Sequence, residues 1–565
     1  MSRSAGSSVA LLAVVALGAC SRTPEPVADL IVINGDVRTM DPAHPAATAL
    51  VVTAGRIDFV GSDADARRRA GPDTKVIDAR GSTVLPGLID SHIHAAEGAL
   101  ARGGCSLADK ELSIEAAAPI IKACFAAHAP PGLLVVTDVN PADFKASRKE
   151  LDAIERARPL LLWGTDGHTG WANSRALELA EITRATHDPE DGRIERGAKN
   201  EPTGFLVDGA VSLVLALLPE PTPEKRIEKI RWILPQLHAV GITSIFEANT
   251  DADTVAAFAE LARRKQLDAR VTIALESEGD DTPEEFRRLE DVRKMAAGEP
   301  LLRADFIKLF ADGVLEYPTQ TAALLAPYLD AQGKPTTSHG SLYVPLEQMK
   351  SFIEHANEKG FNIHVHAIGD AAVRETLDAF AAARSKGNRR LFSIAHLQLI
   401  DPADLPRFAQ LNVVASYQLL WAQPDNYSVD AVAKYIGPER HARQYPARAL
   451  RDAGGIIAGG SDWDVSSFNP FEAMAVAMSR RNPDHPERAP LGSDEALTLD
   501  DMLVAYTRNA AILIGRDPEV GTLAAGKAAD FIVLDRKLTR DTAADEVRKT
   551  RPVQVFFAGR DVTPP

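Results

Sequence analysis

The feature that most constrains the fold is a regular alternation of short apolar runs with helical stretches between residues 86 and 460. Eight of these runs have the length and composition of buried strands. Strands that alternate with helices favour a parallel sheet, and eight of them indicate a (β/α)₈ TIM-type barrel. The expected strands are residues 88–93, 242–247, 270–275, 306–310, 361–366, 392–396, 413–416 and 456–460.

Both ends of the chain are instead rich in short strands. Near the N-terminus, Asn34-Gly35 follows an apolar run and is a tight-turn signal typical of a hairpin, and residues 49–60 have the pattern of a second hairpin. Residues 530–534 and 553–557 have the same character near the C-terminus. We therefore predict an α/β fold in which the N- and C-terminal segments together form one small β-sandwich, with the barrel inserted between them.

These patterns set the expected domain boundaries. The sandwich takes residues 28–85 and 513–565, and the barrel takes residues 86–512. About 150 residues separate the first two barrel strands, which is far more than one crossover connection needs. Residues from about 100 to 220 are therefore expected to form an insertion near the barrel mouth.

The N-terminus predicts export from the cytoplasm. Residues 1–19 combine an early positive charge with a short apolar run, and Leu17-Gly-Ala-Cys20 resembles the lipobox of a bacterial lipoprotein. Cleavage there would make Cys20 the lipidated first residue, with residues 20–27 as a tether. The alternative is an ordinary cleaved secretory signal. Both alternatives place the protein in the cell envelope, lipid-anchored and periplasm-facing, or secreted.

Cysteine usage and charge narrow the partners. Apart from the lipobox Cys20, the chain has only Cys105 and Cys124, and in an oxidising compartment they are a disulfide candidate, with two buried free thiols as the alternative. The net charge of −15 argues against nucleic acid, which requires a basic surface. We expect a small-molecule substrate, membrane attachment only through the lipid anchor, and a chain that could form a homodimer.

Candidate metal ligands lie at the C-terminal ends of the expected strands, where barrels of this type build their active sites. His92 and His94 are two residues apart, so on a strand both imidazoles point to the same face and suit a Zn²⁺-type ion. The other strand ends carry further candidates. These are Lys308, His364, His366, His396 and Asp462.

This set of residues resembles the amidohydrolase superfamily, and more narrowly amidohydrolase family 3, the YtcJ-like branch that includes N-substituted formamide deformylases. The matching motifs extend in the same order over nearly the whole mature chain. They are Pro86-Gly-Leu-Ile-Asp-Ser-His-Ile-His94, Asp166-Gly-His-Thr-Gly-Trp-Ala-Asn173, Lys308-Leu-Phe-Ala-Asp-Gly313, His364-Val-His-Ala-Ile-Gly-Asp370, Gly460-Ser-Asp462 and Gly521-Thr-Leu-Ala-Ala-Gly-Lys-Ala-Ala-Asp530.

The resemblance implies a role for each candidate. His92 and His94 would bind the more buried of two zinc or other divalent ions, and His366 and His396 the second. Lys308, carboxylated by CO₂, would bridge the two ions. Asp462 would bind metal and transfer the proton, and the catalytic residues would be Asp462, Lys308 and His366. The alternative for Lys308 is an unmodified lysine paired with Asp312 in a one-metal site.

Other residues are candidates for the substrate pocket. His168 either binds substrate or caps the insertion, and His364 either contacts substrate or supports a ligand from within the core. Glu247, Glu316 and Trp463 lie where the sequence departs from the family pattern or next to a ligand, so they are expected to line the pocket.

The expected function is hydrolysis of a C–N bond in an amide, N-formyl or cyclic amide compound by metal-activated hydroxide. One alternative is a metal-dependent deaminase or C–O hydrolase on the same scaffold. The other is a non-catalytic envelope binding protein with a vestigial metal site.

Overall fold

The computed structural model describes residues 27–101, 105–110, 112–127, 132–141, 144–189 and 191–565. The expected signal peptide, Cys20 and nearly all of the expected tether lie outside these residues. Within the described ranges, no helix combines the length and the apolar character that crossing a bilayer requires.

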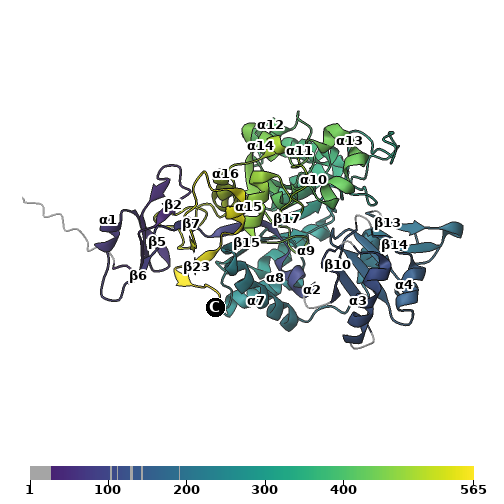
Figure 1. Ribbon diagram of the computed structural model, residues 1–565, viewed down its shortest axis with the longest axis horizontal. Helices are drawn as coiled ribbons and strands as arrows, with labels where there is room; N and C mark the ends of the chain where they lie inside the picture. Colours follow the sequence, from purple (N-terminus) through teal and green to yellow (C-terminus); the bar gives the residue numbers. More distant parts are fainter. Residues whose placement is uncertain (1–26, 102–104, 111, 128–131, 142–143, 190) are drawn as a thin grey trace, which may run out of the picture.

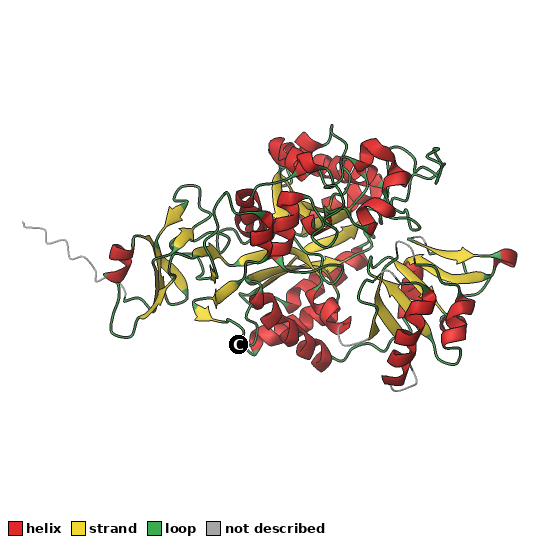
Figure 2. Cartoon of the chain, viewed as in Figure 1, coloured by secondary structure: helices red, strands yellow, loops and turns green. Residues whose placement is uncertain are grey.

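An eight-stranded parallel sheet forms the centre of the molecule, with helices packed around it (Figures 1 and 2). Its strands follow one another in chain order around the sheet, and all eight expected strands are confirmed. They are β8 (Leu88–Ile93), β15 (Ile242–Thr250), β16 (Arg270–Glu276), β17 (Leu302–Phe310), β18 (Asn362–Ala367), β19 (Phe392–His396), β20 (Val413–Tyr417) and β21 (Ile456–Gly459).

The chain just beyond β21 closes the sheet into a barrel. Asp462 N donates to His92 O at 2.7 Å, and His94 N donates to Trp463 O at 2.7 Å. The Asp90 carboxylate also accepts from Ser461 N at 3.0 Å. The hydrogen bonds that join the first and last strands at this seam therefore include the backbones of His92 and His94 themselves.

The helices around the barrel begin with local capping signals and bury one face. In α7 (Pro223–Ala239), Thr222 accepts a hydrogen bond from Lys225 N and proline occupies the first helical position, as at many helix starts. The other helices that surround the barrel or follow its last strand are α2 (Ala95–Ala101), α8 (Ala252–Arg263), α9 (Pro283–Met295), α10 (Leu346–Glu358), α11 (Asp370–Ser385), α12 (Leu405–Leu411), α13 (Ala433–His441), α14 (Ala447–Asp452), α15 (Pro470–Ser479), α16 (Leu499–Val504) and α17 (Ala510–Leu513).

Two sheets form the sandwich, at the left of Figure 1. The first contains β5 (Arg56–Gly61), β4 (Ala49–Thr53), β1 (Leu30–Ile33) and β6 (Lys75–Asp78). The second joins both ends of the chain, because β7 (Thr83–Pro86) pairs with β22 (Phe531–Leu534). Its other strands are β24 (Arg560–Asp561), β23 (Pro552–Phe557), β2 (Asp36–Arg38) and β3 (Ala46–Ala47). Helix α1 (Asp63–Arg67) packs on the first sheet, and α18 (Ala544–Arg548) packs against α15 of the barrel.

The expected hairpin at Asn34-Gly35 is wrong, whereas the hairpin of β4 and β5 is confirmed. Strand β1 pairs with β4 and β6, but β2 pairs with β3 and β7 in the other sheet. Asn34 has a φ of +54° and makes a sharp turn. The turn therefore carries the chain from one sheet of the sandwich to the other.

The insertion has a sheet of its own, at the right of Figure 1. The strand order is β13 (Gly192–Arg196), β14 (Pro202–Asp208), β12 (Thr169–Ala172), β11 (Leu160–Gly164), β10 (Leu134–Val139) and β9 (Cys105–Ser106). Its helices are α3 (Ile114–Ala127), α4 (Arg148–Ile154), α5 (Ser174–Leu179) and α6 (Gly209–Leu215).

A disulfide joins Cys105 to Cys124 and ties α3 to the edge strand β9. The two residues are 19 positions apart, and in the chain-entropy model a loop of this size contributes roughly 3 kcal/mol to stability. We expect non-reducing peptide mapping to recover the linked pair, and Cys105→Ser/Cys124→Ser to lower the free energy of unfolding of the insertion by about that amount. Two free thiols in the unreduced protein would contradict this expectation.

Candidate active site

Three ligand atoms converge at the C-terminal opening of the barrel. His92 is the penultimate residue of β8, His94 directly follows the strand, and Asp462 follows β21 across the seam. The Oδ1 atom of Asp462 lies 3.2 Å from His92 Nε2 and 3.1 Å from His94 Nε2. One ligand atom from each of these residues lies within 4.8 Å of the other two, which is the spacing of a metal site.

The chemistry of these atoms fits a cation. The Asp462 Oδ1 and His94 Nδ1 atoms are buried without a hydrogen-bond partner in the described part of the chain. Burial and the neighbouring Lys308 lower the pKa of His92 to about 3, so its imidazole is neutral. Two imidazole nitrogens and a carboxylate oxygen at this spacing are ligand atoms that a divalent ion such as Zn²⁺ would satisfy together.

His366 and His396 stand beside this group. The ring centroids of His366 and His396 are 4.4 Å apart, and His396 is 4.8 Å from His92. The His396 Nδ1 atom has no hydrogen-bond partner among the described residues and lies 3.9 Å from Asp462 Oδ2. In contrast, His366 Nε2 donates to Gly313 O at 3.0 Å. The structure therefore brings both histidines to the cluster, with His396 directed at Asp462 and the Nε2 atom of His366 engaged elsewhere.

Lys308 lies within the same cluster. Its side chain is 1% exposed, and Nζ is 3.4 Å from His92 Nε2 and 4.5 Å from the centroid of the Phe310 ring. The alternative pairing with Asp312 is wrong, because the Asp312 carboxylate accepts hydrogen bonds from the backbone N–H groups of Ala323, Ile368 and Gly369. Burial lowers the pKa of Lys308 to about 8.

A chain of hydrogen bonds supports His92 from behind. His364 Nε2 is 2.8 Å from His92 Nδ1, and His364 Nδ1 is 2.7 Å from Ser393 Oγ. If His92 Nε2 binds a metal, its proton is on Nδ1 and is donated to His364, which in turn donates from Nδ1 to Ser393. His364 is completely buried, so this hydrogen bond can orient His92 from within the core.

We expect His364→Phe to weaken metal binding by about 10–100-fold, the usual effect of removing a hydrogen-bond partner behind a metal ligand. Phenylalanine conserves a ring next to Phe246, whose centroid is 4.8 Å from that of His364, so packing is largely kept. Chelator competition would measure the affinity, with Ser393→Ala predicted to have a smaller effect. An unchanged metal affinity in His364→Phe would show that the chain of hydrogen bonds is dispensable.

Two other expected pocket residues, Glu247 and Trp463, are buried close to the cluster. The Glu247 carboxylate accepts hydrogen bonds from the backbone N–H groups of Ala95 and Ala96, at 3.1 and 2.9 Å, and so fixes the start of α2 beside His94. Trp463 is 5% exposed and packs edge-to-face on Phe468, with centroids 5.5 Å apart. Both side chains are buried, and these contacts place them in the rim of the barrel.

His168 and Glu316 do lie at the opening. His168 comes from the loop between β11 and β12, and its ring centroid is 5.9 Å from that of His366. Glu316 follows β17 and is partly buried, and burial raises the pKa of its carboxyl to about 7. The sequence did not single out Trp421, which stacks on His396 at a centroid distance of 5.6 Å. Its position, an aromatic residue four positions after the end of β20, was the sequence signal that could have identified it.

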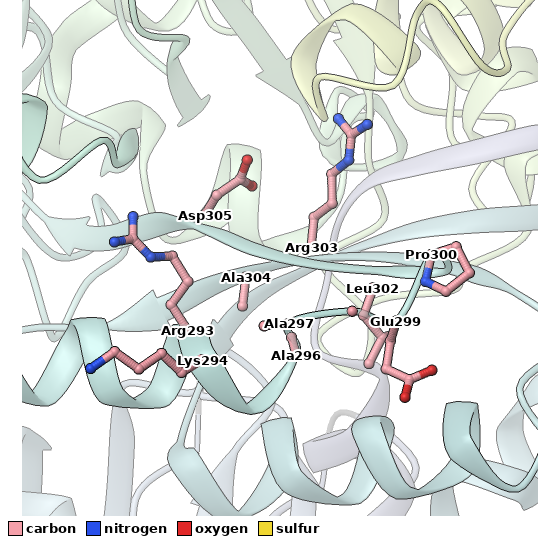
Figure 3. Close-up of a pocket in the computed structure, with 11 residues that line it drawn as sticks. Arg293, Lys294, Ala296, Ala297, Glu299, Pro300, Leu302, Arg303, Ala304 and Asp305 are labelled. Carbon is pink, nitrogen blue, oxygen red and sulfur yellow. The ribbon is translucent and has the colours of Figure 1, made fainter.

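The hollow drawn in Figure 3 is not this opening. It has a volume of about 630 Å³ and is lined by the end of α9 and the first residues of β17, including Arg293, Arg303 and Asp305. Leu302 begins strand β17 at the hollow, and Lys308 lies six residues later, about 20 Å along the strand at the usual rise per residue. The hollow therefore belongs to the opposite end of the barrel.

Fold and site together define the class of metal-dependent barrel hydrolases. The chain belongs to the amidohydrolase family, whose model matches residues 75–563. It is 30% identical to N-substituted formamide deformylase of Arthrobacter pascens, over 94% of this chain and 97% of that protein. It is 27% identical to the Bacillus subtilis protein YtcJ, assigned as an amidohydrolase, over 89% and 93% of the two chains. The expected family and branch are thereby confirmed.

The fold also matches a solved structure. A metal-dependent hydrolase from Pyrococcus furiosus superposes with a TM-score of 0.68 and covers 90% of this chain and 99% of its own, at 24% sequence identity. This agreement confirms the barrel fold with its terminal sheets.

Proposed function

We propose that this protein hydrolyses a C–N bond in a small-molecule amide, N-formyl compound or cyclic amide. The observation that carries the proposal is the convergence of His92, His94 and Asp462, with Lys308, inside an amidohydrolase barrel. Zinc held there would lower the pKa of water to near 7 and so supply hydroxide at neutral pH. The formamide deformylase relative supports an N-formyl group as the first substrate to test.

The residues around the cluster have separate roles in this proposal. His92 and His94 hold the metal, and His366 and His396 are the candidates for a second one. Asp462 Oδ2 accepts a proton from the attacking water and returns it to the leaving nitrogen, which would otherwise depart as a poor anionic leaving group. The amide is converted to a carboxylic acid and a free amine.

We further propose that Lys308 is carboxylated by CO₂ and bridges two ions. Only a neutral amine reacts with CO₂, and burial without a paired carboxylate in the described chain favours that form. The carbamate would add a negative charge that offsets two cations. The carbamate oxygens would extend beyond Nζ, which lies 3.4 Å from His92 Nε2.

We also propose that the enzyme works outside the cytoplasm on a small molecule, tethered through lipidated Cys20. The lipobox supports this, and so does the Cys105–Cys124 disulfide, which is typical of oxidising compartments. Mass spectrometry of the mature chain is the test. A chain that starts elsewhere or stays in the cytosol would rule out the anchor.

The proposed reaction is tested with metal-loaded protein and a panel of N-substituted formamides, simple amides, cyclic amides, aminopurines and esters. Product analysis separates the possible outcomes. Free amine from a formamide or an amide supports the proposal, whereas ammonia or alcohol as the only product would establish the deaminase or C–O hydrolase instead. Metal content without turnover of any compound would favour a binding protein.

A further inference from the structure

The insertion sends one histidine into the barrel opening, and an unusual arrangement holds that histidine in place. His168 Nδ1 donates to Asp208 Oδ1 at 2.5 Å. The two backbones are joined as well, because Asp208 N donates to His168 O at 2.7 Å. The side chain of His168 is 19% exposed, so the ring is enclosed but still reachable.

Asp208 is itself held from the barrel. Its second oxygen, Oδ2, accepts a hydrogen bond from the Tyr343 hydroxyl at 2.9 Å. Tyr343 belongs to the loop that follows β17, the strand that carries Lys308, and its N–H donates to Ala311 O at 2.9 Å. The insertion and the metal-bearing strand are therefore linked through one carboxylate.

The backbone of Asp208 is strained. Its φ and ψ angles are +51° and −129°, a combination that L-residues other than glycine rarely adopt. Such a conformation persists only where surrounding contacts enforce it, and residues of this kind gather at functional sites. The loop of His168 is also fixed, since Asp166 Oδ1 accepts from the N–H groups of His168 and Thr169.

We propose that His168 is a catalytic residue contributed by the insertion, which donates a hydrogen bond from Nε2 to the carbonyl oxygen of the bound substrate, and that Asp208 and Tyr343 position it. This inference rests on the proposed hydrolase function. An imidazole protonated on both nitrogens and held at Nδ1–H by a carboxylate presents its second N–H, at Nε2, to the substrate, and the negative charge of Asp208 favours this form. The ring lies next to His366, where the carbonyl group of a bound amide would lie.

In this proposal the insertion contributes a group to the active site, which gives it a function at the barrel mouth. The barrel supplies the ligands that hold the metal, and the insertion supplies a donor on the opposite side of the substrate. A donor placed at a developing oxyanion typically contributes about 10²–10³-fold to turnover.

The experiment compares His168→Ala, Asp208→Asn and Tyr343→Phe with a matched control, His355→Ala. His355 on α10 makes the same kind of contact, Nδ1 to Asp281 Oδ1 at 2.6 Å, but on the protein surface. Hydrolysis of 4-nitroformanilide is one readout. The second is the visible spectrum of the Co²⁺-loaded protein titrated with formate, the carboxylate product, which requires no turnover.

We expect His168→Ala to lower kcat/KM by about 100-fold or more and to weaken formate binding by about tenfold or more, with metal content and melting temperature unchanged. Asp208→Asn and Tyr343→Phe should lower kcat more than they raise KM, in that order of severity, and His355→Ala should match wild type. Formate affinity and turnover within twofold of wild type in His168→Ala would overturn the inference, as would a wild-type spectrum that does not respond to formate. Loss of formate binding in His168→Ala, combined with a wild type that cleaves no amide, would retain the inference and reject the proposed reaction.

Discussion

Replacing His92 by alanine is expected to abolish hydrolysis while the barrel still folds. His92 supplies one of the three atoms of the cluster and is the ligand that the His364 and Ser393 hydrogen bonds orient. Loss of a ligand should exceed the roughly 10–100-fold effect of losing a partner behind it, so we expect at least about a thousandfold decrease in turnover. Elemental analysis would measure the metal that is lost together with activity.

The control for this variant is His44→Ala. The His44 side chain is 85% exposed and lies in the sandwich, between β2 and β3, and not in the barrel. It should retain wild-type metal content and turnover. Circular dichroism should give the same spectrum for both variants. A His92→Ala protein that keeps its metal and most of its activity would show that the cluster is not the catalytic centre.

Replacing Lys308 by alanine should remove most activity and one of two metal ions. The lysine is buried within the cluster, and its carbamate is the only proposed group that touches both ions. The vacated space beside His92 can accept a small anion, so added formate or acetate should restore part of the activity. Turnover and metal content, each measured with and without the added carboxylate, test the bridge.

Lys334→Ala is the matched control, because Lys334 is exposed on the loop between β17 and α10. It should behave as wild type and show no response to carboxylates. If Lys308→Ala instead keeps both ions and full turnover without any added acid, Lys308 is not a bridge. The site would then be a simpler one built from the histidines and Asp462.

The barrel was predictable because its strands are buried on both faces. Such strands appear in the sequence as continuous apolar runs, and polar residues at their ends, such as His92 and His396, stand out against that background. The parallel register then places the ends of neighbouring strands together, as in the pairing of Ala367 with His396. Ligand candidates on separate strands could therefore be grouped without knowing the side-chain geometry.

Contacts between distant segments were not predictable. Asp208 is 40 residues from His168, and Tyr343 is 135 residues from Asp208, so no spacing or periodicity joins them. The sequence also could not reveal that Glu247 and Trp463 hold the barrel rim, because the same residue types line pockets elsewhere. Asn34-Gly35 has the composition of a hairpin turn, but the choice of sheet depends on partners that come from the other end of the chain.

The most direct test of the central claim is elemental analysis of the protein, coupled to turnover of an N-substituted formamide before and after chelation. We predict about two divalent ions per chain, zinc foremost, with turnover lost on chelation and restored by added metal. Protein that contains no transition metal and cleaves the formamide equally well in the presence of a chelator would contradict the account.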